Sequence, residues 1–337
     1  MDYNKPFDQT NPAAGYVNGN PATNTAGSIP CAEGLEFPQR EIVAAITAAG
    51  LTPSNADLTQ LLQAIGILAR RQIIGVAPTI PTGDVTIHVS TAGNDATADG
   101  TTTKPFATIY AAALYASRRY FFAGYKLIVQ LDVPGTYAAP GGLPALGGQV
   151  VVRGDPNNHG PYIVQGAGPA QGGGSLIAAN NGCQVTTSGL TIVNTGTING
   201  HIGAGLASSI SFDNCEFLST VATGQGIIIA AGGGSAICGA GNIINCYAGA
   251  ALLATGGNIL LASTLTVLNN PAFSAAFAVA INSGGSINVS QGVGIAGAAQ
   301  GQRYSASLNA SINTLGGGEQ FFPGTGAGVK LTGGQYA

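Results

Sequence analysis

The sequence predicts a mainly β fold, a parallel β-solenoid preceded by a small α-helical region. Three observations lead to this prediction. Two short strands with alternating apolar residues recur as a unit every 23 to 28 residues. Glycine, at 53 of 337 residues, crowds the connections between these strands. Charged residues make up only 7% of the chain, against about 25% in an ordinary soluble domain.

Composition excludes several function classes. Lysine and arginine total 11 against 14 acidic residues, so the basic surface that a nucleic-acid-binding protein needs is missing. Residues 217–302 contain no charged residue and no histidine, but polar residues interrupt them too often for a membrane-spanning helix of about 20 apolar residues. The chain also begins without a basic segment followed by an apolar run. We therefore expect no nucleic-acid partner, no membrane insertion and no secretory signal.

Residues 1–80 form the predicted helical region. Their opening is rich in proline, asparagine and glycine, which indicates extended chain without its own core. A first helix is predicted over 41–49, ending at Gly50. A second follows the capping-box spacing of Ser54 and Asp57. Its apolar residues at helical spacing are Leu58, Leu61, Leu62, Ile65 and Leu68. Helices this short must pack against something else.

The solenoid is predicted to occupy residues 81–318. Its first strand is 85–89, and a polar turn over 93–100 leads to a helix from Pro105 to Arg119. A strand at 126–131 follows that helix. Because the first coil of a solenoid exposes its core, we expect the helix to cover that end as a cap. Residues 319–337 are assigned to a C-terminal tail.

The repeated units begin at Val185, Ile210, Ala236, Ile259 and Ile287, advancing by 25, 26, 23 and 28 residues. Propeller blades are longer, at about 40–50 residues. One coil cannot bury its own apolar face, but stacked coils share a continuous core. The residues expected to point inward are Ile210, Phe212, Phe217, Ile259, Leu261, Ile287 and Val289.

Three stretches resemble proteins of tailed bacteriophages. The segments GSIP (27–30), EFPQREIV (36–43), LTPS (51–54) and DLTQL (57–61) resemble the N-terminal region of tail fibres. TAGND (91–95) and KPFATI (104–109) are similar to the start of pectate-lyase-like β-helices of phage and bacterial surface proteins. GGGEQFFPG (316–324) and LTGGQYA (331–337) resemble the C-termini of phage β-helix fibres. Together the stretches cover roughly a third of the chain, and the repeats match in architecture alone.

The resemblance implies a right-handed β-helix in a homotrimeric virion structural protein, a tail fibre or short spike involved in host attachment. It implies assembly in the host cytoplasm, a place in the virion tail, and contacts with other tail or connector proteins through residues 1–80. A host surface glycan is a further candidate partner. A bacterial surface adhesin is a weaker alternative, because the expected secretory signal is absent.

Catalytic chemistry has one candidate pair. Asp213 and Glu216 are the only carboxylates between residues 161 and 318, and they flank one turn. Glycoside hydrolysis uses two carboxylates about 5–9.5 Å apart, so the pair could serve a tailspike depolymerase that hydrolyses host surface polysaccharide. The other interpretation is a polar turn on a solvated corner. The sequence favours the second, and a non-enzymatic protein.

No metal centre and no cofactor are expected. The five cysteines form no CxxC pair, and we interpret them as buried free thiols. The histidines His88, His159 and His201 lie on separate predicted elements. Asp95, Asp99 and Gly100 suggest a turn before the capping helix rather than a calcium loop. The tripeptide Arg153-Gly154-Asp155 suggests a coil corner rather than an adhesion motif.

Overall fold

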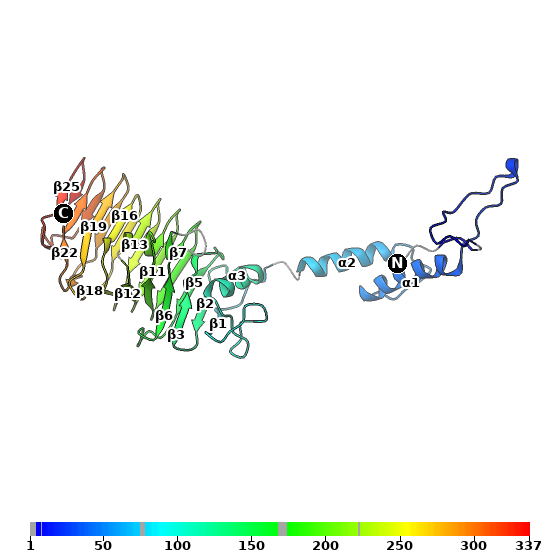
Figure 1. The fold of residues 1–337 in the computed structure, drawn as a ribbon, viewed down its shortest axis with the longest axis horizontal. Helices are drawn as coiled ribbons and strands as arrows, with labels where there is room; N and C mark the ends of the chain where they lie inside the picture. Colours follow the sequence, from blue (N-terminus) through cyan, green and yellow to red (C-terminus); the bar gives the residue numbers. More distant parts are fainter. Residues whose placement is uncertain (1–4, 8, 75–77, 168–173, 222) are drawn as a thin grey trace. The chain divides into compact units, whose positions relative to one another are not determined.

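The computed structural model describes residues 5–7, 9–74, 78–167, 174–221 and 223–337. The chain divides into two compact units, residues 1–77 and 78–337. Unit 1 contains a short 3-10 turn (Pro21–Thr23) and the helices α1 (Ala32–Ala48) and α2 (Gln60–Ile74). Unit 2 contains α3 (Ile109–Arg119) and three sheets in which every strand pair is parallel. The prediction of a mainly β, parallel β-helical protein with N-terminal helices is confirmed (Figure 1).

Each coil of the solenoid contributes strands to the three sheets in turn. The first sheet contains β1 (Val85–Val89), β2 (Lys126–Leu131), β5 (Gln149–Arg153), β8 (Gln184–Ser188), β11 (Ser209–Asp213), β14 (Ser235–Cys238), β17 (Asn258–Leu261), β20 (Ser286–Val289), β24 (Ser311–Asn313) and β26 (Gln335–Tyr336). The second contains β3 (Gly135–Ala138), β6 (Tyr162–Gly166), β9 (Thr191–Asn194), β12 (Glu216–Ser219), β15 (Ile243–Ile244), β18 (Leu265–Val267) and β21 (Ile295–Ala296). The third contains β4 (Gly141–Leu143), β7 (Ser175–Ala179), β10 (Gly200–Ala204), β13 (Thr223–Ala231), β16 (Ala248–Thr255), β19 (Ala272–Ile281), β22 (Gln300–Gly301), β23 (Tyr304–Ala306) and β25 (Val329–Lys330).

Residues at equivalent positions of successive coils stack in rows along the solenoid. One inward row of the first sheet places Ile210 beside Ala236, followed by Ile259 and Ile287. All seven side chains predicted to point inward are buried, at 4% exposure or less. The strands around them alternate buried and half-exposed residues, as in β11 and β17. The period-2 pattern therefore identified the core-facing side of these strands correctly.

The third sheet was not predicted. The segments 248–251 and 275–278, which are rich in alanine, belong to β16 and β19 of this sheet. Their strands are apolar on both faces, so the alternation that marks a half-buried strand is absent. One inward row of this sheet consists of six stacked alanines, Ala179, Ala204, Ala230, Ala254, Ala280 and Ala306.

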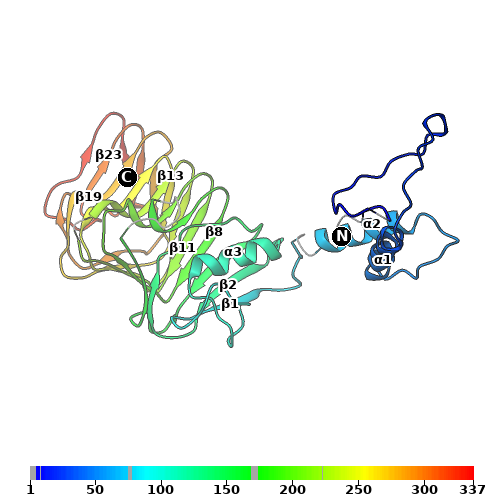
Figure 2. The same cartoon turned by 45° about the vertical axis from the view of Figure 1, so that its right-hand side comes forward.

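The helix α3 covers the N-terminal end of the solenoid (Figure 2). Its Ile109, Ala112 and Ala116 are fully buried in the core. The helix begins at Ile109, later than the predicted Pro105. The difference has two causes. Phe106 pairs with β1 through backbone hydrogen bonds to His88 and Ser90, and Thr108 caps the helix with its hydroxyl.

The C-terminal end is closed by aromatic side chains. Phe322 and Tyr304 are fully buried, and Tyr336 stacks on Tyr304 with ring centroids 3.8 Å apart. Phe322 also stacks on Phe277 at 5.9 Å. The residues assigned to a tail, 319–337, thus pack onto the core and add β25 and β26 to the sheets. The solenoid therefore extends past residue 318 to Tyr336.

The helices of unit 1 begin at other residues than the sequence indicated. The first starts at Ala32, nine residues before the predicted Glu41, and contains Pro38. Its N-cap, Cys31, makes no side-chain capping bond, so the usual start signal is missing. The second starts at Gln60, after Asp57 accepts hydrogen bonds from the Thr59 backbone and hydroxyl. Among the described residues, no helix is long and apolar enough to cross a membrane.

Candidate functional site

The two carboxylates predicted as a candidate pair lie on different sheets. Asp213 ends β11 in the first sheet, and Glu216 begins β12 in the second. Asn214 lies between them and has a left-handed backbone with a φ of 49°, which turns the chain sharply. Asp213 Oδ1 accepts a hydrogen bond from the Ala240 amide of the next coil at 3.1 Å. This bond fixes one coil corner onto the next.

Glu216 belongs to a line of polar side chains along the second sheet. Its Oε1 accepts a hydrogen bond from Asn245 Nδ2 at 2.9 Å, and Asn269 Nδ2 donates to Asn245 Oδ1 at 2.6 Å. On the other side, Glu216 Oε2 lies 3.8 Å from His159 Nδ1. The glutamate side chain is 18% exposed. This row of polar side chains therefore joins successive coils, and the Glu216 carboxylate has a structural role in it.

The carboxylates of Asp213 and Glu216 thus contact different groups. Asp213 faces a backbone amide, and Glu216 faces a histidine and an amide side chain. Hydrolysis would require both groups to converge on one glycosidic bond from opposite sides. The hydrogen bonds described here instead favour the interpretation of a polar corner, and the depolymerase remains an alternative.

Further charged groups lie in the first coils of the solenoid. His88 Nδ1 lies 2.7 Å from Asp132 Oδ1, and both side chains are 23% exposed. Arg153 Nε donates to Gln130 Oε1 at 2.7 Å, while Asp155 accepts from the Asn157 amide. Arg153 ends β5, so the Arg-Gly-Asp tripeptide lies at the corner between β5 and β6.

Asp95 and Asp99 lie in the polar turn before α3, where both accept hydrogen bonds from nearby residues. Asp95 accepts hydrogen bonds from the Ala107 and Thr108 amides and from the Thr108 hydroxyl, at 2.7 to 3.0 Å. Asp99 accepts from the Thr101 amide and hydroxyl, which hold the pKa of this carboxyl below its usual value. The two aspartates thus order the polar turn and the start of the capping helix.

His201 is buried in the solenoid core. Its Nε2–H donates to the Leu218 carbonyl at 2.7 Å and lies 3.1 Å from the Ser219 hydroxyl. The ring meets Phe217 edge-on. Nδ1 has no hydrogen-bond partner among the described residues. Burial lowers the pKa of His201 to about 4, so the imidazole is neutral at pH 7.

The cysteines divide by exposure. Four are buried, and burial raises the pKa of Cys183 and Cys215 to about 11 and that of Cys238 and Cys246 to about 12. Such thiols stay protonated at neutral pH and are poor nucleophiles. In the part of the chain that the structure describes, no group of three or more histidine, cysteine or acidic side chains could hold a metal ion.

Unit 1 contains a groove that sequence reasoning missed. It has a volume of about 380 Å³ and lies between α1 and the start of α2. Ile42, Val43 and Ile46 line it from α1, with Leu58 and Leu61 opposite. Gln60 shapes its end, because its side chain bonds to Thr52 and Ser54 of the connecting loop. Ile42, Val43 and Ile46 fall inside the helix that the sequence predicted, but the packing of that helix against the residues around Leu58 is a tertiary contact that periodicity does not indicate.

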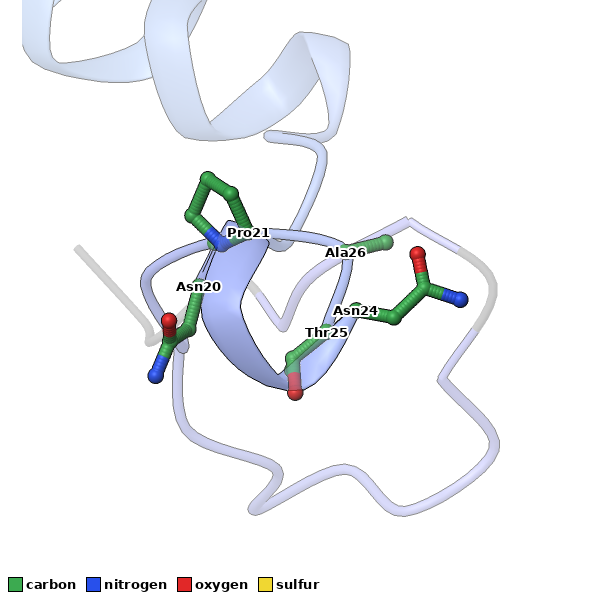
Figure 3. A pocket seen from close by; sticks show the side chains of 6 residues that line it. Asn20, Pro21, Asn24, Thr25 and Ala26 are labelled. Carbon is green, nitrogen blue, oxygen red and sulfur yellow. The ribbon is translucent and has the colours of Figure 1, made fainter.

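The extended arm before α1 folds into a hairpin. Figure 3 shows its tip, where Asn20 and Thr25 pair through two backbone hydrogen bonds. Asn20 also caps the short turn, and Asn24 has a left-handed backbone. A hollow of about 300 Å³ at this tip is lined by small and uncharged side chains. The surface offers hydrogen-bonding groups but no titratable group.

Comparison with known protein families, curated proteins and solved structures finds no match to this chain. The fold itself defines the class of protein: a parallel β-solenoid with a cap at each end, preceded in the sequence by a separate helical unit.

Proposed function

We propose that this chain is a non-enzymatic structural protein of a tailed-phage virion, a tail fibre or short spike that takes part in host attachment. The observation that carries the proposal is the pairing of a capped solenoid with a small unit rich in exposed apolar residues. The segments that resemble phage fibres supply the virion context. Other tail or connector proteins are the proposed partners of unit 1, with assembly in the host cytoplasm.

Imaging of the particles tests this proposal. Antibody fragments against unit 2 should label the tail of intact virions in electron micrographs. Labelling confined to the host cell surface would instead support the adhesin alternative. If the antibody fragments bound the free protein but labelled no particles, a role in the virion would be rejected.

The depolymerase alternative makes a separate prediction. A protein with both Asp213→Asn and Glu216→Gln retains the size and polarity of the corner while losing both carboxylates. Under our proposal, wild type and double variant leave host capsule polysaccharide equally intact, as measured by size-exclusion chromatography after incubation. Depolymerisation by the wild type that the double variant lacks would establish the enzyme instead.

We further propose that the chain forms a parallel homotrimer. Residues 217–302 carry no charge, so the surface that they present to water has only uncharged groups. On the third sheet, Ile229 and Leu253 form a buried cluster apart from the main core, and Val279 packs against it partly exposed. Soluble domains usually spread charges over their exposed faces, and extended uncharged faces tend to be covered by partners. Light scattering should give about three times the 33.2 kDa chain mass. A stable monomer at micromolar concentration would contradict the proposal.

A further inference from the structure

Asparagine followed by glycine occurs three times in the sequence, at Asn18-Gly19, Asn181-Gly182 and Asn199-Gly200. This dipeptide has its own chemistry, because the glycine nitrogen can attack the side-chain carbonyl carbon of the asparagine and close a succinimide ring. Glycine has no Cβ that would shield its nitrogen or restrict its backbone, so the attack is easiest at such a pair. The structure places the three pairs in different surroundings, and these surroundings decide which pair can react.

The reaction exchanges the side-chain amide for a carboxylate. The bond from the glycine nitrogen to asparagine Cγ forms, the bond from Cγ to Nδ2 breaks, and the proton of the glycine nitrogen leaves with the ammonia. Water then opens the ring at one of its two carbonyl carbons. Opening at Cγ yields aspartate, and opening at the main-chain carbon yields isoaspartate, which adds a methylene group to the main chain. Either carboxyl is ionised at pH 7, so each conversion adds a negative charge.

Asn181-Gly182 lies in the turn between β7 and β8, where the glycine nitrogen is engaged. It donates to the Ser208 hydroxyl of the next coil at 2.9 Å and to the Leu206 carbonyl at 3.4 Å. The Ser208 side of this contact is buried, because the residue is 4% exposed. The nitrogen cannot reach Cγ while these bonds hold it, so a reaction at this pair requires the turn to open.

Asn199-Gly200 lies at the start of β10, in the third sheet. Gly200 is buried and pairs with Ser175 of β7. The amides of Asn199 and Gly200 both donate to the Gly174 carbonyl, at 2.8 and 3.4 Å. Closing the ring would require the strand to leave its register with β7. The sheet therefore protects this pair.

Asn18-Gly19 lies in the extended arm of unit 1, and both residues are exposed. The arm is hydrogen-bonded on either side of the pair, at Val17 and at Asn20, but the Gly19 nitrogen has no hydrogen-bond partner among the described residues. Gly27 lies opposite. A side-chain carbon there would come within 2.9 Å of the Gly19 nitrogen, and glycine leaves that side open. Because a lone two-stranded hairpin is marginally stable, this part of the arm opens readily.

We infer that Asn18 is a site of spontaneous deamidation, which converts a neutral residue of the arm to aspartate or isoaspartate, and that the solenoid protects the other two pairs. The modification needs water and no enzyme. It places a charge beside the uncharged hollow at the tip of the arm, which Gly19 and Asn20 help to line. Isoaspartate also lengthens the main chain between the two bonded points of the arm. The inference does not depend on the proposed function, since it concerns the chemistry of the chain itself.

Peptide mapping by mass spectrometry tests the inference on the full-length chain, incubated in mildly alkaline buffer. Conversion raises the mass of a peptide by about one mass unit, and chromatography separates isoaspartate from aspartate. In the folded protein, Asn18 should convert at least about tenfold faster than Asn181 or Asn199, because both of these require local opening. In guanidinium chloride the three rates should agree within about threefold, because only the shared Asn-Gly sequence then matters.

Two variants complete the test. Asn18→Gln keeps an amide but removes the reactive pair, so the acidic species that forms first in isoelectric focusing of the wild type should disappear. Ser208→Ala removes the hydroxyl that holds the Gly182 nitrogen. It should speed conversion of Asn181 by about threefold to tenfold, the effect of one hydrogen bond, and leave the rate at Asn18 unchanged.

Similar rates at the three asparagines of the folded wild type, or faster conversion at Asn181 or Asn199, would overturn the inference. A Ser208→Ala protein that converts Asn181 no faster than the wild type would overturn the protective role of this hydroxyl. Circular dichroism checks that the variants are folded. The comparison of the three sites within the wild type needs no variant, so it decides the inference even where Ser208→Ala fails to fold.

Discussion

Replacing Phe322 with alanine should lower the free energy of unfolding of the solenoid by about 3–5 kcal/mol, the usual range for a fully buried phenylalanine. The ring is completely buried and contacts three other aromatic rings, those of Phe277, Phe321 and Tyr336. Phe322 covers the core of the last coil that the structure describes. The alanine variant would therefore leave a cavity there.

Urea denaturation measures this loss, and hydrogen exchange locates it. Because each coil is stabilised mainly by its neighbours, exchange should accelerate first in β25 and β26, while β8 and β11 remain protected. Leu315→Ala is the matched control, since Leu315 is 59% exposed in the same region. Its effect should be within about 0.5 kcal/mol. Comparable effects of the two substitutions would contradict the assignment of Phe322 to a cap.

Acid should destabilise the solenoid through His201. The imidazole titrates near 6.5 in the unfolded chain, and burial lowers its pKa to about 4 in the folded protein. Below pH 6.5 the unfolded state therefore binds a proton that the folded state excludes. Stability from this group is complete above pH 6.5 and falls as the pH drops towards 4, by about 3 kcal/mol in total.

The comparison of His201→Gln with wild type isolates this contribution, because carboxylates titrate in both proteins. The loss in unfolding free energy between pH 7 and pH 4 should be about 3 kcal/mol smaller in the variant than in wild type. His88→Gln serves as a control at a partly exposed histidine beside Asp132. The same pH dependence in wild type and His201→Gln would show that the buried imidazole is not responsible.

Alternation predicted two of the three sheets. Ile210 and Phe212, or Ile287 and Val289, are two residues apart with a polar residue between them, and this pattern marks a strand with one face in the core. β13 and β16 lack the pattern because apolar residues occupy both faces. Sequence periodicity alone cannot separate such a strand from an Ala-rich connection.

The ends of the solenoid and the helix boundaries depend on contacts distant in sequence. Nothing near Phe322 in the sequence indicates that it covers a core shared with Phe277. The start of α3 is set by the pairing of Phe106 with β1. The start of α1 has no capping side chain, so the sequence carries no signal for it. The candidate pair Asp213 and Glu216 was located correctly at one turn, but their separate partners arise from neighbouring coils.

We propose that unit 1 attaches this protein to the virion. Particles assembled with the full-length chain or with a chain lacking residues 1–77 can be purified and compared by quantitative mass spectrometry. Because the solenoid has its own core and both caps, the truncated chain should fold but be absent from the particles, whereas the full-length chain is present. Equal incorporation of the two chains, or absence of the full-length chain from particles, would contradict the claim.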